Sequence, residues 1–354
     1  MCRLSSHLLG LFSYICLLSC TPASPSPSQS LLYVYRFNPA ALLEFSEDLQ
    51  SVSEIPFSLP PHCSLFDLFS PAVGEYLAIE LSCPNGQTVL FFHSERQAVT
   101  QPVRDSDSHF LAWTPDGRAA YLKIDSLGSP RVVRAFTEGR KEEIPISEFT
   151  YDLAVSTHPE EFTFTVSPGL GQGSELYLAE RKGQASQLLY ADPYHYISLA
   201  RFSPDGTQIA FVKTPDTPTP FTVGALWVMD RDGSNARKLS DADAGHGYAA
   251  NWSPDGSRIA LVVRENPEDE RADQAADALI SNIYVVQVES GALIQITFLE
   301  DGRVETPLWS PDGNTLAFNT VVNDRMIVYT ADLATGELRS LTTEPTCCPA
   351  WMRK

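Results

Sequence analysis

Imidazole, carboxylate and phenol groups recur in this sequence shortly before a repeated turn. His62, His109, His195 and His246 each lie six to nine residues before the proline of that turn. Such groups, gathered in one place, can bind a cation, a sugar or a basic peptide end, and several imidazoles with a carboxylate can hold a divalent metal. The candidate binding residues from these segments are His62, Asp107, His109, Tyr194, His195, Asp243, His246, Tyr248, Arg303 and Glu305.

The same segments have a simpler interpretation, because polar loops on a solvated rim carry such residues without any ligand. The sequence contains no nucleophile elbow, phosphate-binding loop or HExxH motif. We therefore assign no catalytic residue, no resident cofactor and no metal ligand, and leave a divalent cation open as an alternative. A binding protein is expected rather than an enzyme.

The turn after these segments occurs six times. Its prolines stand at positions 71, 115, 159, 204, 254 and 311, so the steps are 44, 44, 45, 50 and 57 residues. Proline sets φ at the first corner, aspartate bonds the turn backbone, and glycine takes the positive φ that closes the hairpin. The clear copies are Trp113–Gly117, Phe202–Gly206, Trp252–Gly256 and Trp309–Gly313, and the degenerate copies are Phe69–Pro71 and Thr157–Pro159.

Short β-prone runs around each turn predict four strands per repeat. In the fourth repeat, the strand ending at Phe202 is followed by runs at 209–212, 226–229 and 237–239. Four strands in about 45 residues indicate one blade of a β-propeller. The fold class is therefore all-β, with a single propeller domain of four-stranded antiparallel blades over residues 31–354. Loops that lead into the innermost strands would gather the candidate residues around the mouth of a central channel.

The two ends of the chain predict how the ring closes. Trp351 stands 42 residues after Trp309, in the position of the aromatic residue of an innermost strand. The runs 31–37, 42–45 and 51–55 supply up to three strands that lack an innermost partner. We expect seven blades, the last closed by both termini. Six blades with an N-terminal extension is the alternative.

The repeat resembles the WD40-like PD40 repeats of TolB-type propellers, which also occur in tricorn and prolyl-oligopeptidase propellers. Its best copy runs from Phe202–Gly206 through Met229–Asn235 to Lys238–Ser240, and the resemblance covers nearly all of residues 60–354. TolB-like proteins dock a peptidoglycan-associated lipoprotein and other envelope partners, so the resemblance implies a binding or scaffold role in the cell envelope. Neither the separate N-terminal domain of TolB nor the hydrolase domain of the peptidases is expected here.

A second function stays open beside this one. A propeller family of pectic-oligosaccharide lyases binds a metal among its loops, so a metal-dependent carbohydrate-active enzyme of lyase or glycosidase type is the alternative. The partner would then be an oligosaccharide rather than an envelope protein or peptide.

The N-terminus predicts export. An apolar run at 8–18 follows Arg3 and ends in Leu17-Leu18-Ser19-Cys20, which resembles a bacterial lipobox. Residues 1–19 would be the signal peptide, Cys20 the lipidation site, and the Pro/Ser-rich residues 20–30 a tether. An ordinary secretory signal is the alternative. The mature chain would be a monomer held by lipid on the outer side of the cytoplasmic membrane or in the periplasm. The formal net charge of −19 disfavours nucleic acid as a partner.

Cysteine positions suggest one disulfide. Cys63 and Cys83 flank a turn and would face each other across a hairpin, although two small buried side chains would fit equally well. Cys347 and Cys348 are adjacent, so a bond between them would need strained backbone, and one of them could instead pair with Cys63. Elsewhere, the insertion at 265–282 predicts a short acidic helix over residues 268–279.

Overall fold

The computed structural model describes residues 30–103, 107–125, 131–158, 161–180, 186–243 and 249–353, without the side chains of Glu180 and Asp243. The predicted signal peptide, the lipidation site Cys20, most of the tether, His246 and Tyr248 lie outside the described residues.

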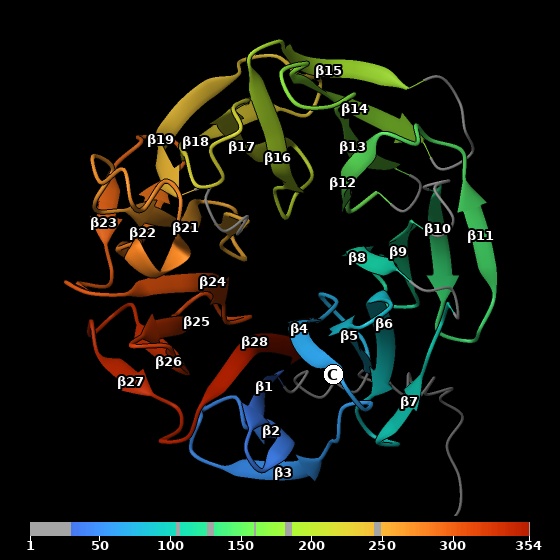
Figure 1. Ribbon diagram of the computed structural model, residues 1–354, viewed down its shortest axis with the longest axis vertical. Helices are drawn as coiled ribbons and strands as arrows, with labels where there is room; N and C mark the ends of the chain where they lie inside the picture. The colour runs from blue at the N-terminus through green and yellow to red at the C-terminus, as the bar shows by residue number, and fades with distance from the viewer. Residues whose placement is uncertain are drawn as a thin grey trace, which may run out of the picture.

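Seven four-stranded antiparallel sheets form a ring, which confirms the predicted fold class and the number of blades (Figure 1). Blades one to three are β4 (Ser64–Phe69), β5 (Tyr76–Cys83), β6 (Gly86–His93), β7 (Ala98–Thr100); β8 (Ser108–Trp113), β9 (Ala119–Ile124), β10 (Arg131–Phe136), β11 (Lys141–Ile144); and β12 (Thr150–Val155), β13 (Glu161–Val166), β14 (Ser174–Glu180), β15 (Gln187–Asp192). Blades four to six are β16 (His195–Phe202), β17 (Gln208–Pro215), β18 (Val223–Asp230), β19 (Arg237–Asp243); β20 (Asn251–Trp252), β21 (Arg258–Arg264), β22 (Ser281–Gln287), β23 (Leu293–Gln295); and β24 (Arg303–Trp309), β25 (Thr315–Val322), β26 (Arg325–Asp332), β27 (Leu338–Ser340).

Blade seven is built from both ends of the chain. Its innermost strand is β28 (Thr346–Arg353), and the N-terminal strands β1 (Ser30–Phe37), β2 (Ala40–Phe45) and β3 (Val52–Pro56) follow outward. β1 pairs antiparallel with β28, with Leu32 opposite Trp351 and Tyr35 opposite Cys347. The hydrogen bonds of this pairing join the two termini, so the predicted composite blade is confirmed.

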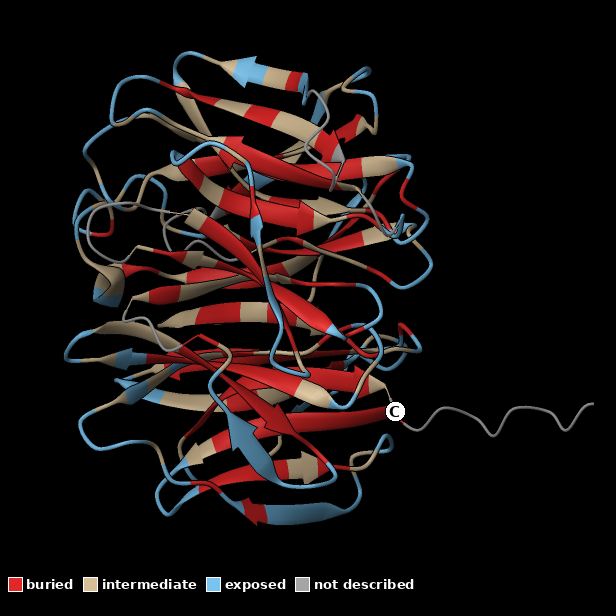
Figure 2. Cartoon of the chain, turned by 90° about the vertical axis from the view of Figure 1, so that its right-hand side faces the viewer, coloured by how far each residue is buried: buried red, intermediate tan, exposed pale blue. Residues whose placement is uncertain are grey.

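Burial follows the position of each strand within its blade. The second strand of a blade is sandwiched between neighbouring sheets and is apolar almost throughout, as in β5. The outermost strand is exposed, as in β7, where all three residues face solvent (Figure 2). The core is accordingly divided into clusters between adjacent blades, which is why the sequence shows nearly continuous apolar runs in the middle strands.

Each clear copy of the turn is built in the same way. Ser203 Oγ donates to Asp205 Oδ1 at 2.6 Å, and the same carboxylate oxygen accepts the backbone N–H of Thr207 at 3.1 Å. Gly206 has φ +72°, the left-handed conformation that closes the turn. The hydroxyl and carboxylate together satisfy the polar groups of the turn, which explains why these residue types recur at this spacing.

Both pairs of described cysteines are oxidised. Cys63 and Cys83 are joined by a disulfide. A disulfide also joins the adjacent residues Cys347 and Cys348. The backbone of Cys348 is in the left-handed region, with φ +63°. A pairing of either residue with Cys63 is therefore wrong.

The helix predicted at 268–279 is also wrong. This segment consists of turns and one 3-10 turn, η2 (Ala276–Ala278). Arg264 explains the difference, since its buried guanidinium donates to the carbonyl of Asp269 and the carboxylate of Asp273 and thereby folds the insertion around itself. Within the described ranges, no helix is both long and apolar enough to cross a membrane.

Candidate functional site

The innermost strands begin on a common face of the ring. Every blade has the same meander order, so the segments leading into β4, β8, β16 and β24 emerge on one side, here called the mouth face. His62 is exposed in the segment before β4 and Tyr194 is 76% exposed before β16, while His109, His195, Arg303 and Glu305 lie on the innermost strands themselves. The innermost strands surround the centre of the ring (Figure 1).

A cluster in blade two gathers two of the candidate residues. His109 Nε2 lies 3.3 Å from Asp107 Oδ1 and 3.9 Å from Asp125 Oδ2, and Nδ1 lies 3.4 Å from Glu80 Oε1. Asp107, His109 and Asp125 each place one ligand atom within 4.8 Å of the others. Glu80 is only 4% exposed and is fixed by the backbone N–H of Phe110 at 3.2 Å. The hydrogen bond with Glu80 raises the pKa of His109 despite the opposing effect of burial.

Asp67 of blade one and Glu305 of blade six are two carboxylates near the centre of the ring. Asp67 of β4 lies opposite Glu80 of β5 in the strand register. Burial, together with the charges of Glu80 and Glu305, raises the pKa of Asp67 to about 7. Glu305 of β24 is 4% exposed and accepts a bond of 2.8 Å from Arg303 Nε, so these two candidate residues form a partly buried ion pair. The centre of the ring is therefore acidic between blades one and six.

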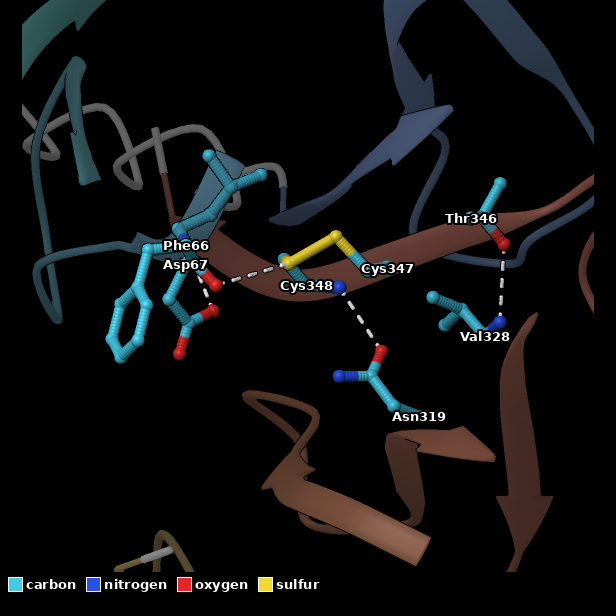
Figure 3. The surroundings of a disulfide bond; sticks show 8 residues. Phe66, Asp67, Asn319, Val328, Thr346, Cys347 and Cys348 are labelled. Carbon is cyan, nitrogen blue, oxygen red and sulfur yellow. Dashed lines mark hydrogen bonds between the residues drawn. A yellow bond between two sulfur atoms is a disulfide. The ribbon is translucent and has the colours of Figure 1, made fainter. Parts of the chain in front are cut away.

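The disulfide between Cys347 and Cys348 lies beside this acidic region, next to Phe66 and Asp67 (Figure 3). Cys348 Sγ is 3.9 Å from the carbonyl oxygen of Phe66, and the backbone N–H of Cys348 donates to Asn319 Oδ1 at 3.0 Å. These contacts link blade seven to blades one and six at the point where the ring closes.

His195 belongs to a separate network that joins blades three and four. Its Nδ1 lies 3.0 Å from Asp192 Oδ1, and Lys213 Nζ lies 2.5 Å from Asp192 Oδ2. Burial by itself would raise the pKa of Asp192, but hydrogen bonds from Lys213, from the backbone of Tyr194 and from His195 lower it to about 2. His195 and His109 are thus engaged by different carboxylates.

A cleft of about 600 Å³ opens beside this network. It lies between the segment 145–149, which connects β11 to β12, and the sheet of blade three. Phe149, Phe164 and Tyr177 give it aromatic walls, and Glu175 and Asp192 contribute carboxylates. Its size is within the range of sites for small ligands and peptide side chains.

Several of these residues were not among the sequence candidates. Glu80, Asp125 and Lys213 lie on or just after second strands of their blades, where no turn motif marks them. The aromatic wall of the cleft looks in sequence like ordinary core of a strand. Asp192 was detectable, because it lies two residues before Tyr194 and three before His195 in a mouth-face segment. The side chain of Asp243 and the residues His246 and Tyr248 lie outside the described part of the chain.

The family of this propeller is shown by a comparison with family models. A family model described as the TolB beta propeller domain matches residues 164–348. The chain belongs to the TolB β-propeller family. The match begins within β13 of blade three, covers blades four to six completely and ends in β28.

Sequence relatives of this TolB-type propeller cover it only in part. It is 35% identical over 95 residues to the uncharacterized peptidase YuxL of Bacillus subtilis, and 20% identical over 153 residues to dipeptidyl-peptidase 5 of Porphyromonas gingivalis. These alignments cover 27% and 42% of this chain but only 13% and 21% of the two relatives.

Solved structures share the fold at low identity. An oligogalacturonate lyase in complex with manganese matches with a TM-score of 0.60 at 14% identity, covering 89% of this chain and 85% of the lyase. TolB from Acinetobacter baumannii gives 0.51 at 15% identity, covering 88% and 78%. A prolyl endopeptidase gives 0.63 at 11% identity, covering 92% of this chain and 50% of the peptidase. The fold is thus shared by TolB, a lyase and a peptidase, and activity must be argued from the site.

Proposed function

We propose that this chain is an exported, lipid-anchored binding propeller of the cell envelope that recognises a protein or peptide partner on its mouth face as a monomer. The single observation that carries the proposal is the cleft of blade three, a concave aromatic surface that opens beside the His195 and Asp192 network. Membership of the TolB propeller family supports a binding role. The predicted lipobox at Cys20 supports the location.

The partner can be sought by site-specific crosslinking in cells. A photoreactive phenylalanine analogue in place of Tyr194, which is 76% exposed beside the cleft, is expected to capture a defined envelope component. The same analogue in place of Val99, which is 45% exposed on the outer strand β7, is the matched control. Equal capture at both positions, or none at Tyr194, would contradict a mouth-face partner. Cys20→Ser is expected to release the chain from the membrane fraction.

A metal-dependent carbohydrate-active enzyme is the second candidate. The observation that favours it is the group Asp107, His109 and Asp125, whose ligand types suit manganese or zinc. Glu80 on Nδ1 would orient the imidazole, as carboxylates commonly do for metal-bound histidines. A metal held there would act as a Lewis acid on a sugar carboxylate or hydroxyl. Lys123 competes, since its Nζ lies 3.1 Å from Asp125 Oδ2.

Elemental analysis and manganese titration by electron paramagnetic resonance distinguish the two candidates. If the chain is a metal-dependent enzyme, stoichiometric metal should be present, and His109→Gln should lose it. The control His158→Gln should retain the metal, because His158 lies on the opposite face, in the turn of blade three. A metal-free chain that binds manganese no better than the His109 variant would exclude this candidate and leave the binding role intact.

A further inference from the structure

We propose that the cleft of blade three binds a cationic group on an apolar stem, the chemistry of an arginine or lysine side chain of a partner peptide. The inference rests on the proposed binding role and specifies what the cleft recognises. Three features carry it: the aromatic walls, the sign of the charge, and the fixed shape of the cleft.

The walls present aromatic faces in a form suited to a flat or cationic group. Phe164 and Tyr177 stack with ring centroids 5.3 Å apart and an interplanar angle of 13°. Phe164 is only 5% exposed, so it backs the partly buried ring of Tyr177 and holds it in position. Phe149 stands on the other side in the connecting segment and is 52% exposed. Arginine and lysine side chains stack their apolar stems and charged ends on such rings.

The charge of the lining is negative. Glu175 and Asp192 are the charged residues among the described residues that line the cleft, and lysine, arginine and histidine are absent from that set. The charge of Asp192 is already balanced by Lys213. Glu175 accepts a hydrogen bond from the hydroxyl of Tyr177, and no lysine, arginine or histidine of the described chain forms an ion pair with it. Glu175 is therefore the carboxylate available to a cationic ligand.

The rim of the cleft is held in place before any ligand arrives. The backbone N–H of Gly173 donates to Asp216 Oδ2 of the next blade at 2.8 Å, and Ser174 Oγ accepts the N–H of Ile197 at 2.7 Å. Gly173 has φ +68°, and a Cβ there would meet the carbonyl oxygen of Asp192 at 2.2 Å. Proline at positions 145, 168 and 193 stiffens the three segments of the rim. A preformed rim lowers the entropic cost of binding.

A saccharide can also stack on aromatic rings, but its neutral hydroxyls would use Glu175 only as a hydrogen-bond acceptor, which is weaker than a charge-assisted bond. A neutral peptide leaves the same charge unused and would gain only from the apolar wall. A cation on an apolar stem is therefore the ligand that contacts the rings and also pairs with the charge of Glu175. The test accordingly compares ligands that differ in charge.

The test compares two peptides of nearly equal shape on the purified full chain. N-acetyl-Phe-Arg-amide and N-acetyl-Phe-citrulline-amide differ in charge but share the planar end group, and isothermal titration measures their affinities. A cation–π contact with a ring, together with an ion pair to a partly exposed carboxylate, stabilises the complex by on the order of 1 kcal/mol. About fivefold tighter binding of the arginine peptide is therefore expected. Binding of both peptides with equal affinity, or of neither, would overturn the inference.

Three variants tie the preference to the cleft. Glu175→Gln should abolish the preference for arginine, while Glu289→Gln, an exposed glutamate in the turn between β22 and β23, should retain it. Phe149→Ala should weaken both peptides by roughly three- to tenfold without changing their ratio, and its exposed side chain makes misfolding an inadequate explanation. A preference that survives Glu175→Gln would place the cation elsewhere.

The results that would contradict the proposed function differ from those that would contradict this inference. The analogue at Tyr194 could capture an envelope partner while the arginine peptide shows no preference. The mouth face would then bind a partner, and only the inference about a cationic ligand would be wrong. If the arginine preference is present and no partner is captured, the cleft is a cation site and the envelope role falls.

Discussion

The indole Nε1 of Trp309, at the end of β24, donates a hydrogen bond of 2.8 Å to the carbonyl oxygen of Asn251 in β20 of the preceding blade. Trp113 makes the same bond to Phe69 at 2.9 Å, and Trp252 makes it to Arg201 at 3.1 Å. The aromatic residue of the repeated turn therefore does more than fill space. It joins the innermost strands of adjacent blades by a bond to backbone, which phenylalanine at position 202 cannot make.

Trp309→Phe should lower the free energy of unfolding by about 1–2 kcal/mol, because it removes this bond and part of a buried ring. Urea denaturation followed by circular dichroism measures the change. Trp227→Phe is the control, since the described part of the chain shows no hydrogen bond from its indole, while both tryptophans carry a cation over the ring, Lys213 on Trp227 and Arg258 on Trp309. An equal loss in both variants would show that ring volume alone matters.

Asp67→Asn should stabilise the protein increasingly as pH rises from about 4 to 7. Burial and two neighbouring carboxylates raise the pKa of Asp67 from 3.8 to about 7 in the folded chain. Between these values the unfolded chain is ionised at this residue while the folded chain keeps the proton, so the stability of the parent chain falls as pH rises through this window. The gain over the parent chain should reach on the order of 1 kcal/mol or more near pH 7 and vanish below pH 4. Thermal melts at several pH values measure it.

Asp255→Asn is the matched control of opposite sign. Hydrogen bonds from Ser253 and Ser257 lower the pKa of Asp255 to about 2, so its stabilising effect is present above pH 4 and is lost as pH falls toward 2. The difference between this variant and the parent chain should stay constant from pH 5 to 7. A difference for Asp67→Asn that is equally constant would contradict the raised pKa of this carboxyl.

Replacing Cys63 and Cys83 together with serine should lower the free energy of unfolding by about 3 kcal/mol, because a cross-link across a separation of 20 residues limits the unfolded chain. Denaturation under non-reducing conditions measures the loss. The single variant Cys63→Ala should lose about as much. Native mass spectrometry that finds two free thiols at these positions in the untreated chain would rule out the bond.

Removal of residues 346–354 should abolish cooperative unfolding of the ring. β28 supplies the innermost strand of blade seven, and without it β1 to β3 lose their pairing to the C-terminus and the cluster around Tyr33 and Met352 is opened. Removal of residues 1–29 should leave the melting transition unchanged and is the control. A sharp calorimetric transition at the parental temperature in the first truncation would show that the ring closes without this strand.

The sequence alone predicted the blades and favoured seven of them, with six left open as the alternative, and the structure has seven. A local signal carries this information, since Ser203, Pro204, Asp205 and Gly206 satisfy their own turn through bonds between near neighbours. Even the closure of the ring was predictable, because Trp351 lies in the repeat position and the first three strands lack an innermost partner. Local chemistry fixes each hairpin, and the regular spacing of hairpins leaves a closed ring as the way to cover every blade.

Tertiary structure alone decided what the mouth face contains. The sequence placed His109 and His195 in equivalent segments and suggested a shared site, but Glu80 engages one and Asp192 the other. The helix expected at 268–279 gave way to turns around the buried Arg264. The cleft joins residues of a connecting segment, two middle strands and an outer strand, whose distances depend on how blades pack. Spacing along the chain fixes which face a residue occupies, but the partner of each charge is set by packing between blades, which no local motif records.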